Sequence, residues 1–180
     1  DQNIHKDIKL LKSQAERCKS ILLKLSTNPL KIKDNFFEKI SVEDLIKLNF
    51  DKFNSNKKLK ISNSINQSNL KIIFKDEIMY AIGNILQNAI FHSKSIVKVE
   101  IQYLNNNLLL KIEDDGNGFA NDILDKLGEP YIVSGKNGMG LGIFIAKNLI
   151  ENLKGSIFFK NSNDGHAVVN IQLNESILSI

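Results

Sequence analysis

The sequence predicts an α+β fold, a two-layer α/β sandwich in which helices cover one face of a mixed β-sheet. Two observations predict it. Helical segments are interspersed with strand-like segments, and several strands follow one another as antiparallel hairpins, an order that is typical of helices gathered on one side of a sheet. The chain has 180 residues, of which 42% are hydrophobic, so it is large and apolar enough for one globular domain with an appended helix.

Residues 4–26 are predicted to form a long helix with a coiled-coil seam. Apolar or small side chains recur at alternating steps of four and three residues, which is the a/d spacing of a coiled coil or helical bundle: Ile4, Ile8, Leu11, Ala15, Cys18, Leu22 and Leu25. One helix alone does not bury such a seam, and no later helix matches it, so we expect a homodimer through this helix. The alternative is that the seam packs on the globular domain. Pro29 ends the helix, and residues 27–34 are interpreted as a linker.

The rest of the chain divides into helices and strands by its hydrophobic periodicity and its turn residues. Helices are expected at 41–53, 74–92, 120–127 and 140–153, with Ser41 as a start signal and Gly155 as a stop signal. Strands are expected at 36–40, 57–65, 97–103, 108–112, 156–160 and 167–173. Polar turns at 105–107 and 163–165 join the last four strands into two hairpins.

Composition argues against several classes of function. The net charge is +4 and the pI is near 9.0, but basic and acidic residues are interspersed, so nucleic acid is not expected as a partner. The single cysteine, Cys18, excludes an internal disulfide framework and a cysteine-based zinc cluster, and it fits a reducing, cytoplasmic setting. No membrane-spanning run and no signal peptide are visible. Because the chain begins within helical sequence, we expect it to be a fragment of a longer protein.

Two asparagines share one face of the predicted helix 74–92. Asn84 and Asn88 are four residues apart, so they point to the same side, beside the apolar stripe rather than within it. An amide oxygen is a hard, neutral ligand of the kind that Mg²⁺ accepts together with water. Two asparagines on a helix face can equally be plain solvent contacts, since asparagine is common in this chain.

An acidic glycine-containing turn follows the predicted strand 108–112. Asp114 is followed by Gly116 and Gly118, which permit a tight turn and close approach of the backbone to a ligand. Taken alone, this is also the pattern of an ordinary acidic turn.

A glycine-rich segment precedes the predicted helix 140–153. With Gly138, Gly140 and Gly142 at its start, the exposed N–H groups of that helix form a cradle for phosphate. No Gly-Lys-Ser/Thr follows, which excludes a Walker loop, and no buried strand of a βαβ unit precedes, which excludes a Rossmann fingerprint. A glycine hinge is the alternative. In combination, the three segments predict a site for a nucleotide with a magnesium ion.

These segments resemble three sequence boxes of the GHKL ATPase superfamily, in its histidine-kinase branch. Residues 84–89 resemble the N box, 114–118 the G1 box and 138–142 the G2 box, with 141–147 as its continuation, while 129–131 resemble the F box. The likeness covers residues from about 30 to 174. It implies the GHKL (Bergerat) type of sandwich.

The resemblance also implies a division into two domains. The helix 4–26 is similar to the second helix of a dimerisation and histidine-phosphotransfer domain, so residues 1–28 would be an incomplete domain of that kind. Residues 29–180 would be the ATP-binding catalytic domain.

The resemblance implies a role toward ATP and Mg²⁺ for each matching position. Asn88 would coordinate the metal, with Asn84 supporting it from one turn earlier. Asp114 would accept a hydrogen bond from the adenine amino group, and Gly116 and Gly118 would shape the floor beneath the base.

The triphosphate would be wrapped by the glycine-rich segment, that is by Gly138, Gly140, Leu141 and Gly142. A lid at about 128–138 would close over it, and Lys136 is assigned to a phosphate from its charge and position.

Two positions depart from the histidine-kinase pattern. Phe91 stands where many of these kinases carry a basic residue three positions after the magnesium asparagine, and His92 stands at the next position, where an aromatic residue is usual. Phosphate contact from this helix would therefore fall to His92, which we otherwise expect to form part of the pocket wall.

Within the histidine kinases, the sequence resembles the RegB/PrrB redox-sensor group. The likeness is carried by residues 10–22, 127–131 and 138–147, and it implies a redox-responsive cysteine at Cys18. Arg17 and Lys19 flank this cysteine and favour its thiolate form. The alternative is that Cys18 is a small buried apolar residue of the helical seam. Mild oxidation followed by non-reducing electrophoresis distinguishes the two, because Cys18→Ala should abolish any covalent dimer.

A phosphoaccepting histidine is the part of a histidine kinase that this sequence lacks. None of the histidines, His5, His92 and His166, is followed by the acidic residue and proline of such a site. We therefore expect the acceptor on an upstream helix and expect this chain not to autophosphorylate alone. It would be the cytoplasmic portion of a parent protein, and this sequence does not determine whether that protein spans a membrane.

The function expected from the sequence is thus the ATP-binding catalytic region of a two-component sensor histidine kinase, with a response regulator as partner. Two alternatives stay open. One is a GHKL ATPase that uses ATP as a conformational switch, like gyrase, MutL or Hsp90, against which Asn84 argues because those relatives have a hydrolytic glutamate there. The other is a dimeric scaffold that has lost nucleotide binding.

Overall fold

The computed structural model describes residues 39–53, 55–65, 70–73, 76–132 and 140–179. All of them belong to one compact unit, Phe37–Ile180. The predicted coiled-coil helix 4–26 and linker 27–34 lie outside the described residues, so the dimerisation helix and the domain boundary near residue 28 stay predictions.

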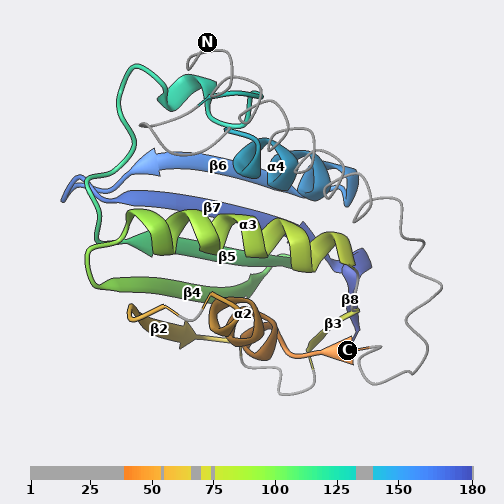
Figure 1. Cartoon of the computed structure of the whole chain (residues 1–180). Helices are drawn as coiled ribbons and strands as arrows, with labels where there is room; N and C mark the ends of the chain where they lie inside the picture. The colour runs from red at the N-terminus through yellow and green to blue at the C-terminus, as the bar shows by residue number, and fades with distance from the viewer. Residues whose placement is uncertain (1–38, 54, 66–69, 74–75, 133–139, 180) are drawn as a thin grey trace, which may run out of the picture. The chain divides into compact units, whose positions relative to one another are not determined.

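A five-stranded mixed sheet forms the larger layer of the domain (Figure 1). Its strand order is β2-β4-β5-β7-β6, with β2 parallel to β4 and every other neighbouring pair antiparallel. The strands are β2 (Lys58–Asn63), β4 (Ile96–Leu104), β5 (Asn107–Asp114), β6 (Ser156–Asn161) and β7 (Ala167–Asn174). This arrangement confirms the predicted mixed sheet and both predicted hairpins.

The alternation of side chains along β5 places an acidic group on the inner face of the sheet. Leu108, Leu110 and Ile112 are buried there, each 1% exposed or less. Because side chains on a strand alternate between faces with a period of two, the next inward position is that of Asp114. The carboxyl group of Asp114 therefore lies on the same side of the sheet as the helices. The turn before β5 is a tight one, with positive φ at Asn105 and Asn106.

Three α-helices of the described residues lie on one side of the large sheet, as Figure 1 shows. They are α2 (Val42–Asp51), α3 (Asp76–His92) and α4 (Gly142–Asn152). The helix α2 begins at a capping serine, because the hydroxyl oxygen of Ser41 accepts a hydrogen bond from the N–H of Asp44 at 3.1 Å. The helix α3 is in contact with both α2 and α4, so it occupies the middle of the helical layer.

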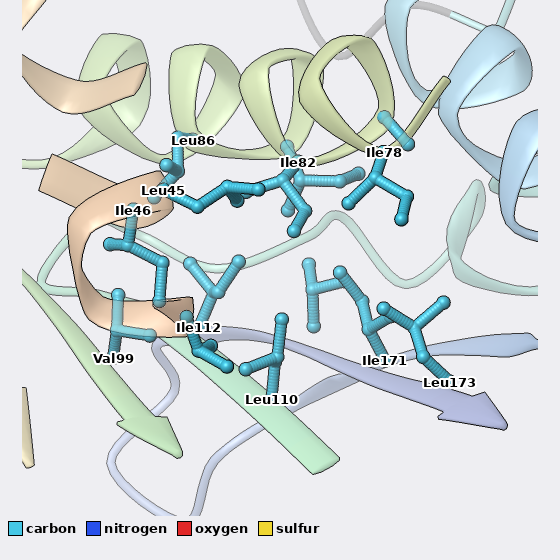
Figure 2. Close-up of a cluster of buried hydrophobic side chains, with 14 of the residues drawn as sticks. Leu45, Ile46, Ile78, Ile82, Leu86, Val99, Leu110, Ile112, Ile171 and Leu173 are labelled. Carbon is cyan, nitrogen blue, oxygen red and sulfur yellow. The ribbon is translucent and has the colours of Figure 1, made fainter. Parts of the chain in front are cut away.

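The core forms between α3 and the inner face of the sheet (Figure 2). Figure 2 shows Ile78, Ile82 and Leu86 of α3 pointing toward Leu110 and Ile112 of β5, with further buried side chains from α2, β4 and β7 around them: Leu45, Ile46, Val99, Ile171 and Leu173. Complete burial of such a side chain contributes roughly 1.5–3 kcal/mol. This packing holds α3 against the sheet and directs its asparagines away from the core.

A second, three-stranded antiparallel sheet was not expected from the sequence. Its order is β1-β3-β8, formed by β1 (Lys39–Ile40), β3 (Lys71–Ile73) and β8 (Leu178–Ser179). A short 3₁₀ helix, Glu175–Ile177, leads into β8. Only β1 falls within a predicted strand. Strands of two or three residues are too short to show a period of two.

One predicted helix and the predicted start of another are wrong. The segment 120–127 is not an α-helix, because its backbone hydrogen bonds join residues three apart, including Lys126 N–H to Ile123 C=O at 2.9 Å, and only Leu124–Lys126 is a 3₁₀ turn. The other helix starts at Gly142 rather than at residue 140, because Gly140 has a φ of +65° that an α-helix excludes. Within the described residues, we find no helix with both the length and the apolarity needed to cross a membrane.

Candidate nucleotide-binding site

One flank of α3 carries the polar residues that the sequence assigned to the metal and the phosphates. Asn84, Asn88 and His92 follow one another at steps of four residues, so they share this flank. At a rise of 1.5 Å per residue, Asn84 and His92 are about 12 Å apart along the helix. The side chains of Asn84 and Asn88 are half-buried, and His92 is exposed.

The two asparagines differ in how their amide groups are used. The side-chain N–H of Asn84 donates to the backbone carbonyl of Tyr80 at 2.9 Å, which leaves its amide oxygen directed away from the helix axis. The side chain of Asn88 makes no hydrogen bond to another described residue. A half-buried amide oxygen without a protein donor is suited to a metal ion or to ordered water.

The start of α4 adjoins the N-terminal asparagine of this flank. A Cβ atom added at Gly142 would lie 3.6 Å from Oδ1 of Asn84, so the first turn of α4 faces Asn84. Leu141, half-buried, immediately precedes the helix, and no side chain within the described part of the chain caps it. The first N–H groups of α4 are therefore available to an anion.

Glycine is required at residue 140 for two reasons. Its φ of +65° lies in the left-handed region. A Cβ atom there would also lie 2.4 Å from the carbonyl oxygen of Ile132, which is backbone and does not move aside. Gly140 thus lets the chain that enters α4 pass directly over the backbone of Ile132.

Asp114 is a buried carboxyl group at the end of β5, with only 4% of its surface exposed. Its Oδ1 accepts a hydrogen bond from the N–H of Gly116 at 2.8 Å. Burial raises the pKa of Asp114, and this effect outweighs the opposing hydrogen bond from Gly116. Its Oδ2 receives no hydrogen bond from the residues that the structure describes. A buried acceptor in this state is costly unless a ligand donates to it, and an adenine amino group would do so.

The turn after Asp114 packs against the C-terminal end of α3. A Cβ atom added at Gly116 would lie 2.4 Å from the carbonyl oxygen of His92, so only glycine lets the two backbones approach this closely. The contact brings Asp114 to the His92 end of the flank, while Gly142 lies at the Asn84 end. Asn88 is midway between them. The structure thus brings the N segment, the G1 segment and the described part of the G2 segment, residues 140–142, together beside α3.

The β6–β7 hairpin supports the turn 114–119 from its other side. The side-chain amide of Asn161 pairs with the backbone of Phe119 in both directions, accepting from its N–H at 2.8 Å and donating to its C=O at 2.9 Å. Gly118 has a φ of +74°, and a Cβ atom there would lie 2.3 Å from the carbonyl oxygen of Gly165. The turn is therefore held closely against the hairpin.

His166 makes a further contact from the same hairpin. Its Nδ1 lies 2.9 Å from the carbonyl oxygen of Gly116. Because a carbonyl only accepts, Nδ1 carries the proton and donates in this contact. The imidazole thereby fixes the orientation of the peptide that follows Gly116.

Sequence reasoning missed both Asn161 and His166 as contributors to the site. A signal for Asn161 is present: Ile157 and Phe159 alternate as inward residues of β6, and Asn161 takes the next inward position. A polar residue that continues an apolar alternation marks a place where the inner face of a sheet leaves the core. Asp114 follows the same rule on β5. His166 had no comparable signal.

Three of the predicted site residues lie outside the described residues: Lys136, Gly138 and Cys18. The same holds for most of the predicted lid, of which only 128–132 are described. Phe91 is 63% exposed, and its ring meets that of His92 edge to face at a centroid distance of 5.0 Å. Neither aromatic side chain belongs to the core.

The donor set fits magnesium better than a softer metal. No group of three His, Cys, Asp or Glu side chains suited to a metal ion occurs among the described residues. A metal ion on this flank would rely on amide oxygens such as that of Asn88, on water, and on oxygens of the nucleotide itself. Such a set of hard oxygen ligands, with few from the protein, is the one that Mg²⁺ prefers.

Comparison with known proteins places the chain among nucleotide-binding domains. Residues 74–177 match the family described as "Histidine kinase-, DNA gyrase B-, and HSP90-like ATPase". The chain is 30% identical to sensor histidine kinase RegB of Cereibacter sphaeroides over 104 residues, which cover 52% of this chain and 22% of RegB. It is also 30% identical to sporulation kinase B of Bacillus subtilis over 100 residues, which cover 54% of this chain and 23% of that kinase. The chain thus spans less than a quarter of either relative.

Solved structures show the same fold. The mycobacterial sensor histidine kinase MprB superposes with a TM-score of 0.66 at 19% identity, over 76% of this chain and 96% of the MprB chain. The histidine kinase AdeS of Acinetobacter baumannii superposes with a TM-score of 0.63 at 20% identity, over 97% of this chain and 83% of the AdeS chain. At these identities the likeness is one of fold.

Proposed function

The chain belongs to the family of histidine kinase-, DNA gyrase B- and HSP90-like ATPases, and we propose that it is the ATP-binding catalytic part of a sensor histidine kinase. The observation that carries this proposal is the buried carboxyl group of Asp114, whose second oxygen faces no donor from the described residues. It lies beside the end of a helix whose asparagines suit a metal ion. This combination fits a ligand with an amino group at one end and metal-bound phosphates at the other.

In this proposal, different residues of the site bind the base, the metal ion and the phosphates of ATP. Asp114 accepts the hydrogen bond of the adenine amino group, with the backbone of Gly116 and Gly118 beneath the base. Asn88 holds Mg²⁺, with Asn84 beside it. The first N–H groups of α4, which begins at Gly142, bind phosphate oxygens. Bound Mg²⁺ supplies positive charge that offsets the charge of the phosphates.

Transfer of a phosphoryl group needs position and electrostatic stabilisation more than reactive side chains. The domain accordingly holds the γ-phosphate in position for attack by an acceptor, and supplies no attacking group of its own. We assign the acceptor histidine to a part of the protein outside this sequence. His166 is engaged with the carbonyl of Gly116, and His92 is followed by Ser93 rather than by an acidic residue.

The partners follow from the same proposal. A response regulator would receive the phosphoryl group from the acceptor histidine. Two copies of the chain would associate through the predicted helix 4–26, and Lys136, Gly138 and the lid would complete the phosphate end of the site. The parent protein would be a membrane sensor whose cytoplasmic portion includes this domain.

Calorimetric titration of the chain with Mg-ADP and with adenosine tests the proposal. The wild-type chain should bind both. Asp114→Ala should weaken both ligands by about 10- to 100-fold, because a hydrogen bond to a charged group contributes roughly 1.5–3 kcal/mol. Asn88→Ala should weaken Mg-ADP by a similar factor and leave adenosine unchanged, since adenosine carries no metal.

Matched controls separate the site from general effects. Asn148→Ala removes an exposed helical asparagine whose side chain bonds the carbonyl of Phe144 at 2.8 Å, as Asn84 bonds Tyr80, and should change neither affinity. Absence of binding to the wild-type chain would leave only a scaffold role. In the parent protein, acid-labile, base-stable phosphate formed from ATP would identify a kinase, and steady phosphate release without phosphoprotein would identify a switch ATPase.

A further inference from the structure

The backbone between α3 and β4 is held by two charged side chains of opposite sign. We call residues 93–96 the α3–β4 junction. The ammonium group of Lys57 donates to the carbonyl oxygens of Ser93 and Lys94, at 2.8 and 2.7 Å. The carboxylate of Asp115 accepts from the N–H groups of Lys94, Ser95 and Ile96, at 2.7, 2.9 and 3.2 Å.

Each charge meets the backbone groups that it favours. The cation stabilises two carbonyls just beyond the C-terminal end of α3, where the helix dipole is negative. The anion collects N–H groups that start β4, and it also accepts the hydroxyl of Ser95 at 2.6 Å. Although partial burial acts in the opposite direction, the hydrogen bonds from Ser95, Ile96 and Lys94 lower the pKa of Asp115. The carboxylate is therefore ionised at neutral pH, and its hydrogen bonds are of the strong, charge-assisted kind.

The two segments that Asp115 joins belong to the two halves of the site. Asp115 directly follows Asp114, whose carboxyl group lies at the base end. The junction directly follows His92, the last residue of the helix that carries Asn88. The side-chain hydrogen bonds of Asp115 span about 20 residues of sequence. The same two segments are also joined by the backbone, through the N–H of Asp115 and the C=O of Ile96 at 3.3 Å, and by the packing of Gly116 against the carbonyl of His92.

We propose that Asp115 is a positioning residue, which sets the placement of the base-binding turn relative to the metal-binding flank of α3. Asp115 touches neither base nor metal in this role. It fixes the backbone from which Asp114 projects against the end of the helix from which Asn88 projects. The proposal rests on the proposed function, because it concerns a ligand that spans both halves of the site.

Loss of the hydrogen bonds of Asp115 should change the affinity for a ligand that contacts one half of the site less than the affinity for a ligand that contacts both halves. Adenosine needs only the base end, whereas Mg-ADP needs the base end and the metal flank at the correct separation. In Asp115→Asn the negative charge is lost, so the three N–H groups bonded to Oδ1 meet a weaker, neutral acceptor. The amide nitrogen in place of Oδ2 also no longer accepts from the N–H and the hydroxyl of Ser95. We expect the affinity for Mg-ADP to fall about tenfold more than the affinity for adenosine, which corresponds to about 1.4 kcal/mol.

Titration calorimetry at a temperature well below the unfolding transition measures both affinities on the full chain. Asp164→Asn, at an exposed residue of the β6–β7 hairpin, is the matched control and should leave their ratio unchanged. Lys57→Met removes the other half of the contact with the junction and should shift the ratio in the same direction as Asp115→Asn. Ser95→Ala, which removes one hydroxyl and keeps the carboxylate, should shift it less, and it serves if Asp115→Asn does not fold.

The outcomes are distinct. A variant with a lower melting temperature and an unchanged ratio of the two affinities would mean that Asp115 only stabilises the fold, and the proposal would be overturned. If the wild-type chain bound neither Mg-ADP nor adenosine, the proposed function itself would fail and this inference with it. A shifted ratio in Asp115→Asn or Ser95→Ala, with the ratio of Asp164→Asn at the wild-type value, supports the positioning role.

Discussion

The base end and the phosphate end of the candidate site are built in different ways. At the base end, the turn that follows Asp114 is held by side chains on both sides: Asp115 bonds the α3–β4 junction, and Asn161 and His166 bond the backbone of Phe119 and Gly116. The geometry of this end therefore exists before any ligand arrives.

At the phosphate end, the first turn of α4 has no side-chain cap from the residues that the structure describes. Among the described residues, nothing but water or a ligand is left to accept from its first N–H groups. Under the proposed function, the fold would preform the base end, whereas bound phosphates would complete the phosphate end. Substitutions at the two ends should consequently have different effects on stability and on binding.

The largest difference is expected between two glycine-to-alanine substitutions. In Gly116→Ala the new Cβ atom would lie 2.4 Å from the backbone oxygen of His92, so the turn must move away from α3. We expect a loss of about 1–3 kcal/mol or more in the free energy of unfolding and no measurable binding of adenosine. In Gly142→Ala the nearest atom is 3.6 Å away, and alanine favours a helix, so stability should be unchanged or slightly raised. Urea unfolding measures both.

Equal losses of stability in these two variants would contradict the comparison, because both ends would then be equally preformed.

A smaller effect is expected from Asn161→Ala on the hairpin side of the turn. This change leaves the N–H and C=O groups of Phe119 without their partner, and a buried group left unpaired costs roughly 1–3 kcal/mol. The midpoint of urea unfolding should fall, and adenosine should bind more weakly because the turn loses one support. Asn163→Ala, at an exposed position of the same hairpin, is the control. Wild-type affinity in Asn161→Ala would show that the hairpin does not preorganise the base end.

The smallest effect at neutral pH, and one that grows on acidification, concerns Asp114. Burial raises the pKa of its carboxyl group, and a protonated carboxyl is a poorer acceptor for the adenine amino group. Adenosine affinity should therefore fall as the pH drops toward this raised pKa, earlier than for an ordinary aspartate. Titrations from pH 7 downward measure the change, and Asp114→Asn, which does not ionise, should lack it. An identical pH profile in both proteins would assign the titration to another group.

The neighbouring aspartates have opposite consequences for stability. The folded protein binds a proton at Asp114 more readily than the unfolded chain does, so this residue favours folding as the pH falls. For Asp115 the pKa is lowered, so its contribution is present above the pKa of an unfolded aspartate and is lost as the pH drops further. The contributions of these two adjacent carboxyl groups to folding stability thus change in opposite directions as the pH falls.

Sequence reasoning found the parts of the site that depend on local patterns. The helical spacing of Asn84 and Asn88 and the position of Asp114 after an alternating strand follow from periodicity within one segment. The glycines at 116 and 140 follow from the close approach that a tight turn and a helix start require. Each of these signals lies within a few residues of the group that it predicts.

The supporting contacts could not be predicted from the sequence, because they join distant parts of the chain. Asn161 and Phe119 are 42 residues apart, and His166 and Gly116 are 50 residues apart. Neither residue type nor spacing indicates which backbone group such a side chain meets. The second sheet was missed for another reason, since its strands are two or three residues long and pair across most of the domain.

The smaller sheet brings the two ends of the described domain close together. Its outer strands β1 and β8 are the first and last strands of the described residues, and both are hydrogen-bonded to β3 between them. Entry and exit of the chain are therefore separated by only two strand spacings, about 10 Å. The first and last strands of the described residues are thus linked through β3, so detachment of either one would leave an edge of β3 without backbone partners.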